Sequence, residues 1–439
     1  MSPIQDGYTL SSHQYLDRVI NLHKQGWAIG IPSICSSNPF VIQASFRNAL
    51  KREVPVLIES TCNQVNQFGG YAGLTPPEFV RYVNDIADQM AFPPSNVILG
   101  GDHLGPYPWR YEPGEKAMHK AKTLVQEYVR AGYTKIHLDA SMPCGGDNPD
   151  LFLETQVAAS RTAELAQAAE LASKEPGDLR YVIGSEVPIP GGIQEKVGHL
   201  AVTTVATVAE TIEVTHQAFR EKGIEEAWQR VIAVVVHPGV EFGNEVIYAY
   251  DPSFSAGLSR FIEAYDHLVY EAHSTDYQTA QALKGMVSDH FAILKVGPAL
   301  TFSLREALFS LAMIEEELIA FKPEFEPSRL LEALEETMIE DPSHWEKYYP
   351  GEPAYQRFAR RYSFSDRIRY YWPYPRVQNA VARLLENLNQ TQLPLSLLSQ
   401  FFPRQYWLIR EGLLDNNPQS IILDKIDVVL QDYTGACGG

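Results

Sequence analysis

The sequence is short of cysteine and of positive charge, and both shortages narrow what the protein can be. Its four cysteines show no paired spacing such as C-x-x-C, which argues against a disulfide framework or a zinc ribbon and favours free thiols in a reducing compartment. The net charge of −18 argues against nucleic acid or an anionic membrane surface as a partner. A small anionic substrate is compatible with this charge, because local groups decide its binding.

Long apolar runs and targeting signals are also missing. No apolar stretch approaches the roughly 20 residues of a membrane-spanning helix, and the first residues lack the basic and apolar regions of a signal peptide. We therefore expect a cytoplasmic protein. Two nucleotide-binding signatures are absent as well, since no G-x-G-x-x-G turn follows the first predicted strand and no G-x-x-x-x-G-K-[ST] loop occurs. Their absence argues against a dinucleotide-binding sheet and a P-loop kinase.

What the sequence does contain is a repeated alternation of short buried strands and helices. The segment 97–106, VILGGDHLGP, shows the pattern most plainly, because three apolar residues lead into glycines and then into an adjacent Asp-His pair. Such apolar runs are typical of strands buried in a parallel sheet. Eight of them alternate with helical patterns, at 28–36, 54–61, 97–103, 134–141, 180–187, 230–237, 268–273 and 291–297. This count predicts an α/β fold of the (β/α)8 TIM-barrel type, with an open doubly wound sheet as the alternative.

Beyond about residue 310 the pattern changes, and only helical segments remain. We therefore divide the chain into a barrel, residues 1–310, which carries the site, and a helical C-terminal extension, residues 311–439, packed on the barrel. An aromatic- and arginine-rich run lies at 360–372. Because the chain is acidic, this run favours packing against the barrel or a subunit interface over stacking on nucleic-acid bases. One of its arginines is a candidate for reaching a phosphate at the barrel mouth.

The candidate site residues follow from the strand ends, because barrel enzymes carry their chemistry at the carboxyl ends of the strands. Histidine nitrogens and carboxylate oxygens are ligands of zinc-like divalent ions. Four such residues end the third, fifth, sixth and seventh strands, namely His103, Glu186, His237 and His273. Each histidine alone is explained as a buried, hydrogen-bonded side chain, but the set predicts a divalent metal site. Zinc is the first choice, with manganese, nickel and cobalt as alternatives.

Longer motifs give the chain a family resemblance. They are NQVNQFGGY at 63–71, GGDHLGP at 100–106, KIHLDAS at 135–141, EAHSTDYQ at 271–278, KVGPALT at 295–301 and DRIRYYW at 366–372. These motifs resemble the Z-type (GatZ/KbaZ) subunit family of tagatose-1,6-bisphosphate aldolase, and the resemblance covers nearly the whole chain. It implies a TIM barrel. Members are described as non-catalytic partners of a class II aldolase subunit, while some relatives are described as ketohexose or ketohexose-phosphate 4-epimerases and others carry a kinase label.

More distantly, the strand ends resemble class II aldolases themselves. That resemblance implies Asp102 as the acid–base residue, with His103, Glu186, His237 and His273 as metal ligands. The catalytic residues are then expected to be Asp102, Glu186 and Asp139, and the substrate-binding residues Ser141, Asn63, Gln64, Asp276 and Lys295. After the seventh strand, the sequence STDY at 274–277 replaces the glycine-rich phosphate loop of the aldolases. This departure argues against a bisphosphate substrate.

The chemistry expected from these residues is inversion at C4 of a ketohexose. C4 is not adjacent to the C2 carbonyl, so proton exchange alone cannot invert it, whereas breaking and re-forming the C3–C4 bond can. A metal ion would polarise the carbonyl, and a carboxylate would move the C4 hydroxyl proton. We predict metal-dependent C4 epimerisation of a ketohexose or ketohexose phosphate of the fructose/tagatose type. The alternative is a non-catalytic subunit that stabilises a class II aldolase. We also expect the chain to form a homo-oligomer.

Overall fold

Eight parallel strands close into a barrel. The computed structural model describes residues 9–147, 153–184, 202–320 and 322–438, with strands in the order β1-β10-β9-β6-β5-β4-β3-β2. Their bounds are β1 Ile31–Cys35, β2 Val56–Thr61, β3 Val97–Leu104, β4 Lys135–Leu138, β5 Arg180–Ile183, β6 Val231–Val236, β9 Val269–Ala272 and β10 Ile293–Val296. All eight overlap the predicted runs, so the TIM-barrel prediction is confirmed and the open sheet is wrong.

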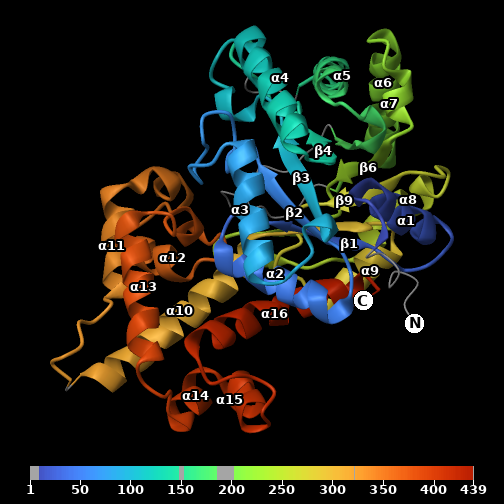
Figure 1. Ribbon diagram of the computed structural model, residues 1–439. Helices are drawn as coiled ribbons and strands as arrows, with labels where there is room; N and C mark the ends of the chain where they lie inside the picture. Colours follow the sequence, from blue (N-terminus) through green and yellow to red (C-terminus); the bar gives the residue numbers. More distant parts are fainter. Residues whose placement is uncertain (1–8, 148–152, 185–201, 321, 439) are drawn as a thin grey trace.

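Helices surround the barrel on the outside (Figure 1). Those that accompany the strands are α1 Ser12–Lys24, α2 Pro39–Arg52, α3 Pro76–Gln89, α4 Gly114–Ala131, α5 Thr155–Ala172, α6 Val205–Glu221, α7 Glu225–Trp228, α8 Pro252–Ile262 and α9 Ala280–Ser288. Local sequence sets their ends. Before α3, for example, the backbone N–H of Thr75 donates to Glu78 Oε2 at 2.8 Å, the capping box that Thr75 and Glu78 predict. A short hairpin of β7 Glu241–Phe242 and β8 Ile247–Tyr248, which the sequence did not predict, lies between β6 and α8.

The C-terminal helices form a lobe beside the barrel (Figure 1). They are α10 Pro298–Ile319, α11 Leu330–Glu340, α12 Pro353–Tyr362, α13 Pro375–Asn389, α14 Leu395–Phe401, α15 Pro403–Arg410 and α16 Pro418–Ala436. α16 packs against α2, α9 and α10 and so joins the lobe to the barrel wall. The proposed division after residue 310 falls inside α10. A short 3-10 turn, η7 (Arg367–Tyr370), contacts α10.

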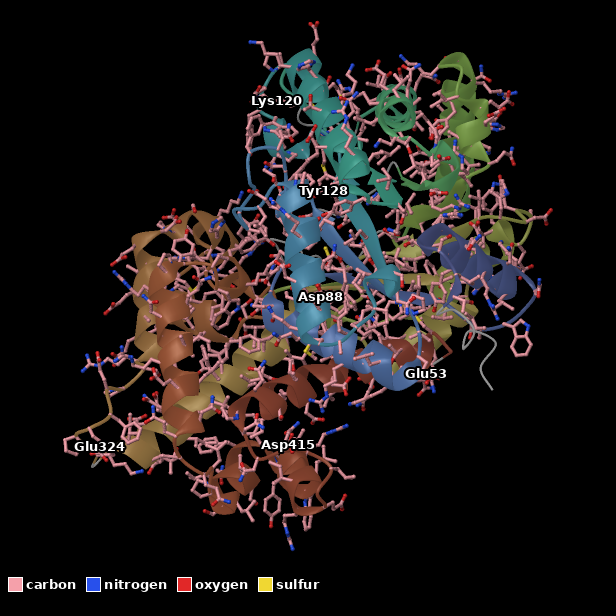
Figure 2. All side chains as sticks on the ribbon, viewed as in Figure 1. Glu53, Asp88, Lys120, Tyr128, Glu324 and Asp415 are labelled. Atoms are coloured by element: carbon pink, nitrogen blue, oxygen red, sulfur yellow. The ribbon has the colours of Figure 1, made fainter. Side chains whose placement is uncertain are left out.

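Apolar side chains fill the amino-terminal half of the barrel. Ile31, Leu57, Ile98 and Val269 are buried there, in one cluster with side chains of α1. Charged side chains stand on the outer surface, where Asp88 of α3 and the loop or turn residues Glu53, Glu324 and Asp415 are exposed, whereas Tyr128 is fully buried (Figure 2). Among the described residues, no helix combines the length and apolar character that a membrane span requires. With one end of the barrel packed, the carboxyl ends of the strands are the place where a polar site can open.

Candidate functional site

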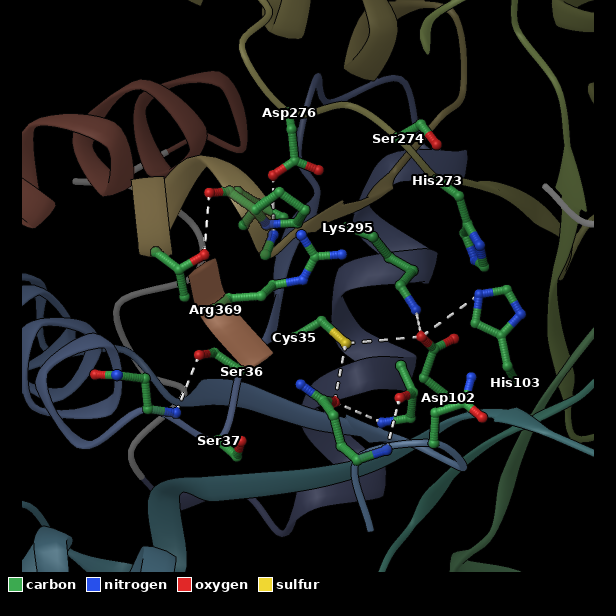
Figure 3. A pocket seen from close by; sticks show the side chains of 18 of the residues that line it. Cys35, Ser36, Ser37, Asp102, His103, His273, Ser274, Asp276, Lys295 and Arg369 are labelled. Carbon is green, nitrogen blue, oxygen red and sulfur yellow. Dashed lines mark hydrogen bonds and ion pairs between the residues drawn. The ribbon is translucent and has the colours of Figure 1, made fainter. Parts of the chain in front are cut away.

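A cavity opens at the carboxyl ends of the strands (Figure 3). It measures about 110 Å³, room for several water molecules at about 10–15 Å³ each. Seven of the predicted site residues line it, namely Asn63, Gln64, Asp102, His103, His273, Asp276 and Lys295. Glu186 lies outside the described residues, so its prediction has no structural counterpart. The barrel thus gathers side chains that are up to 232 positions apart in the sequence, from Asn63 to Lys295.

The end of β3 presents two neighbouring residues to the same cavity. Successive residues of a strand normally point to opposite faces. Here the register of β3 against β4 shifts between Gly101 and Leu104, and His103 has a left-handed backbone with φ of 49°. For a residue other than glycine this conformation is uncommon and marks functional sites. The irregularity lets both Asp102 and His103 line the cavity.

The carboxylate of Asp102 is buried and held from three directions. The ammonium group of Lys295 contacts Oδ2, His137 Nδ1 lies 2.9 Å from Oδ1, and the Cys35 thiol lies 3.7 Å from Oδ2. Figure 3 shows Lys295, Cys35 and His103 gathered around this carboxylate. A cation beside one oxygen offsets the cost of burying a carboxylate charge. Asp102 thus faces the cavity in a fixed position, and its acid–base role stays a prediction.

Asp139 and Ser141 lie behind His103. Asp139 Oδ2 is 2.8 Å from His103 Nδ1, and Asp139 Oδ1 accepts hydrogen bonds from the Ser141 hydroxyl at 2.6 Å and its backbone N–H at 3.1 Å. Burial alone would raise the pKa of the Asp139 carboxyl, but the hydrogen bonds and imidazoles around it hold that pKa below its ordinary value. Neither Asp139 nor Ser141 lines the cavity. In this arrangement they orient the His103 ring.

Sequence reasoning missed a buried row of charges beneath the cavity. Lys135 Nζ lies 2.6 Å from Glu59 Oε1 and 2.6 Å from Glu271 Oε2, and all three side chains are fully buried. Glu271 Oε1 in turn lies 2.9 Å from His273 Nε2. A Cβ at Gly100 would stand 2.6 Å from Glu59 Oε1, so the glycine of the GGDH motif makes room for this row. Charged residues inside otherwise apolar strands were the signal that could have revealed it.

One group of described residues has donor atoms close enough to bind a metal ion. The donors of Asp102, His137, Glu271 and His273 all lie within 4.8 Å of one another, and all four side chains are buried. Burial lowers the pKa of His137 and His273 to about 4, so both imidazoles are neutral at pH 7 and can donate a lone pair. His137 Nε2 is buried without a hydrogen-bond partner among the described residues.

The charges around the cavity also fit a cation. Among the described residues here, five buried carboxylates, those of Glu59, Asp102, Asp139, Glu271 and Asp276, stand against the cationic groups of Lys135, Lys295 and Arg369. Carboxylates thus outnumber cations by two in this set, in a region of low dielectric where unpaired charge is costly. A divalent ion would balance them. The residues present therefore fit the metal that the sequence predicts.

The predicted ligand set and this donor group share His273. The His103 ring packs edge-on against His273, with centroids 4.8 Å apart, so His103 borders the group. His237 is half-buried, and its Nδ1 accepts from the backbone N–H of Gly239 at 3.2 Å. Burial, and secondarily His273, lower the pKa of His237 to about 4. Which of these imidazoles bind the ion stays a prediction.

The comparison with known families decides what kind of protein this is. A sequence model described as D-tagatose-1,6-bisphosphate aldolase subunit GatZ/KbaZ-like matches residues 16–438. The chain belongs to this family. This GatZ/KbaZ-like chain is also similar to a solved structure, a probable tagatose 6 phosphate kinase from Sinorhizobium meliloti 1021, which is 46% identical and has a TM-score of 0.86. The match covers 93% of this chain and 100% of that one.

Weaker likenesses to aldolases add no argument about this GatZ/KbaZ-like chain. The YdjI aldolase from Escherichia coli K12 is 12% identical over 71% of this chain and 87% of that one, with a TM-score of 0.41. The fructose-bisphosphate aldolase from Campylobacter jejuni is 13% identical over 88% of this chain and 96% of that one, with a TM-score of 0.42.

The C-terminal lobe of this family member contributes to the cavity, as the arginine-rich run suggested. Arg369 and Tyr370 of η7 line it, and the Arg369 side chain enters from the side opposite to Asp102 and His103 (Figure 3). The Arg369 guanidinium donates to the carbonyl oxygens of Ser365 and Asp366, which fixes its position. Two residues of this run thus pack against the barrel, which agrees with the packing expected from the sequence.

Asp276 has a structural partner in addition to its place in the cavity wall. Its Oδ1 accepts hydrogen bonds from the backbone N–H groups of Gly297, at 3.0 Å, and Ala299, at 2.8 Å. The carboxylate therefore caps the start of α10, where a helix would otherwise attract a bound anion. Burial raises the pKa of Asp276 to about 6. Its predicted role in substrate binding stays a prediction.

Proposed function

We propose that the chain is a divalent-metal-dependent C4 epimerase of a ketohexose or ketohexose phosphate of the fructose/tagatose type. The observation that carries this proposal is the placement of Asp102. It is a buried carboxylate that lines the cavity, contacts Lys295 and belongs to a group of four potential metal ligands. A metal-capable group and a proton-accepting carboxylate at one point are what cleavage and re-formation of a C3–C4 bond require.

The residues of the chain would divide the work. Asp102 takes the proton of the C4 hydroxyl as the C3–C4 bond breaks, and Lys295 holds the carboxylate in position through its contact with Oδ2. Asp102, His137, Glu271 and His273 would hold the ion, with His103, Glu186 and His237 as the further candidates from the sequence. When bound, a divalent ion supplies Lewis acidity toward the C2 carbonyl of the substrate.

The cover over the barrel mouth favours an epimerase over an aldolase. Both enzymes break C3–C4, but an epimerase has to keep the two fragments together until the bond re-forms. Arg369 and Tyr370 form part of the cavity wall, although they lie more than 65 residues beyond β10 in the sequence. Such a wall would keep the aldehyde fragment beside its partner.

Different residues of the site favour a sugar monophosphate and a free sugar as the substrate. Arg369 carries a permanent positive charge into the cavity, which suits a phosphate. Asp276, however, occupies the start of α10, the feature that often binds phosphate in barrel enzymes. Both D-fructose and fructose 6-phosphate therefore belong in the test.

The test is direct assay of the purified chain. Each sugar is incubated with and without added Zn²⁺, Mn²⁺, Ni²⁺ or Co²⁺, and the C4 epimer is quantified by chromatography. We expect metal-dependent formation of D-tagatose or its 6-phosphate. A metal-loaded protein that converts neither sugar would contradict the proposal.

A second candidate function has its own support. The matching family is described as an aldolase subunit, which favours a non-catalytic chain that stabilises a partner class II aldolase. In that case the purified chain turns over no sugar, and co-expression raises the activity of the aldolase equally for the wild type and Asp102→Asn. The similar structure from Sinorhizobium meliloti is named as a probable kinase. This chain has no P-loop sequence, so we do not propose phosphoryl transfer.

A further inference from the structure

Inversion at C4 makes a demand that Asp102 alone does not meet. In the two epimers the C4 oxygen lies on opposite faces of the carbon chain. A carboxylate that takes the hydroxyl proton on one face cannot return it to the oxygen on the other face while its own position is fixed. Asp102 is fixed by Lys295 and His137. If the proposed epimerisation holds, a second group that can give and take a proton has to stand on another side of the cavity.

Tyr370 is a phenol in that place. It lines the same cavity as Asp102 but belongs to η7 in the C-terminal lobe. Its hydroxyl accepts hydrogen bonds from Arg369 Nη2 at 3.0 Å and Arg367 Nη1 at 3.3 Å. Arg369 enters the cavity from the side away from Asp102 (Figure 3), and its contact with Tyr370 places the phenol on that side.

The ring of Tyr370 is held by stacking as well as by these hydrogen bonds. It packs edge-on against Tyr71, with centroids 4.7 Å apart, and lies parallel to the ring of His344 at 4.9 Å. Two aromatic neighbours and two guanidinium donors leave the hydroxyl little freedom to move. A group fixed in this way is prepared for proton transfer at one point of the cavity.

The two guanidinium groups favour the ionised form of the phenol. Burial alone would raise the pKa of Tyr370, but the charges of Arg369 and Arg367 outweigh it and bring that pKa below its ordinary value. The neighbouring Tyr71 phenol shows the contrast, because burial raises its pKa far above the ordinary value. Of the two tyrosines in this wall, Tyr370 is therefore the one suited to cycle between phenol and phenolate.

Other groups in the described cavity wall are less suited to the role. Cys35 and Lys295 both contact Asp102 and so share its side of the cavity, and burial raises the pKa of Cys35 to about 11. Arg369 does not release a proton near neutral pH. His103 and His273 also line the cavity but are candidate metal ligands. Asp276 is a further competitor, but its Oδ1 is bound to two backbone N–H groups at the start of α10.

We propose that Tyr370 is the second acid–base residue of the epimerisation and serves the C4 oxygen on the face away from Asp102. For one epimer, Asp102 takes the C4 hydroxyl proton, the C3–C4 electron pair passes to the three-carbon fragment as an enediolate, and C4 becomes an aldehyde carbon. The aldehyde group rotates so that its other face meets C3, and the same electron pair re-forms the C3–C4 bond. The new C4 alkoxide then takes the phenolic proton of Tyr370. Exchange with water then returns a proton to Tyr370 and removes the one on Asp102. The reverse reaction starts from the phenolate.

Separate assays of cleavage and epimerisation test this assignment. D-fructose and D-tagatose, or their 6-phosphates, are each mixed with excess enzyme, and an acid quench frees the three-carbon fragments held in the site so that chromatography can quantify them. In Tyr370→Phe, which keeps the ring and its stacking, epimerisation should fall by roughly 10²–10⁴-fold, the usual effect of general acid–base catalysis. Cleavage of one epimer should persist within a few-fold, while cleavage of the other is lost. Asp102→Asn should show the opposite preference.

The control is Tyr371→Phe, which removes a hydroxyl that donates to the backbone oxygen of Asp341 at 2.5 Å and does not line the cavity. Its epimerisation should match the wild type. Equal loss of cleavage for both epimers in Tyr370→Phe would show a structural role and overturn the assignment. The assignment would also fall if Asp276→Asn, and not Tyr370→Phe, lost cleavage of one epimer only. Unchanged epimerisation in Tyr370→Phe would refute this inference alone. A wild type without any turnover would refute the proposed function with it.

Discussion

The ammonium group of Lys295 on β10 contacts the carboxylate of Asp102 on β3, although β1 and β2 lie between these two strands in the barrel. The same ammonium lies 3.6 Å from Glu59 Oε2, which continues through Lys135 to Glu271 and His273. An unbroken row of buried, alternately charged side chains thus joins Asp102, the candidate base, to His273, a candidate metal ligand. Each charge in such a row depends on the next, because none of them is solvated.

The first prediction concerns the base. Asp102→Asn keeps the shape of the side chain and removes its ability to accept a proton. We expect turnover to fall by roughly 10²–10⁴-fold while bound metal is retained, since three other donors of the group persist. Epimerisation rate and metal content are measured side by side for the variant and the wild type. Full activity in Asp102→Asn would remove Asp102 from the mechanism.

The second prediction concerns the stability of the buried row. Lys135→Met removes the cation that lies between Glu59 and Glu271 and leaves two buried carboxylates facing each other. Breaking a buried ion pair by removing one partner costs about 3–5 kcal/mol. We expect a loss of that size in the free energy of unfolding measured with urea.

The exposed pair of Arg376 and Glu340 provides the control for Lys135→Met. Its atoms are 2.9 Å apart, but both side chains are largely solvated. Arg376→Met should change the free energy of unfolding by less than about 1 kcal/mol. Similar small effects for both variants would mean that the buried row carries no special cost.

The strand count made the barrel predictable, and the glycine and histidine patterns made part of the site predictable. Periodicity locates apolar runs, and a barrel brings their carboxyl ends together whatever lies between them. That is why Asn63, Asp102 and Lys295 could be placed in one cavity from the sequence. The carboxyl end of α4, Gly114–Ala131, has a similarly local cause, because Gly132 follows it with φ of 101°, a conformation that glycine adopts easily.

The roles of Lys135, His137, Glu271 and Tyr370 could not be predicted in the same way. The first three lie within strands rather than at the last residue, and whether a strand residue faces the barrel interior depends on register and stagger. Tyr370 comes from a separate lobe, and only the path of the chain through α10–α13 returns it to the barrel mouth. Local patterns hold no information on that path.

The third prediction concerns the metal ion. His273 belongs both to the ligand set predicted from the sequence and to the group that the structure brings together, so His273→Ala should lose bound metal. Elemental analysis of protein dialysed against buffer without added metal measures the loss. Loading equal to the wild type in His273→Ala would contradict a metal site here.

Two further variants separate the alternative ligand sets. Loss of metal in His137→Ala with retention in His237→Ala would assign the ion to the group of Asp102, His137, Glu271 and His273. The reverse result would favour the set read from the strand ends. His344→Ala is the control, because that imidazole stacks on Tyr370 outside both sets and its loss should leave the metal content unchanged.

The last prediction concerns pH and Glu241, a buried residue of the β7–β8 hairpin whose Oε1 accepts from the backbone N–H of Phe242 at 2.9 Å. Burial raises the pKa of Glu241 from 4.5 to about 7 in the folded protein, so the folded state holds this proton more tightly than the unfolded state does. The stabilising effect of that proton is complete below pH 4.5 and is lost as the pH rises to 7.

Glu241→Gln keeps a neutral side chain at every pH, and its free energy of unfolding, relative to the wild type, should therefore rise between pH 5 and 8 by up to about 3 kcal/mol. Urea unfolding of both proteins at pH 5, 6, 7 and 8 measures this difference, with Glu53→Gln on the exposed surface as the control. A difference that stays constant across these pH values would mean that Glu241 ionises as readily in the folded protein as in the unfolded chain.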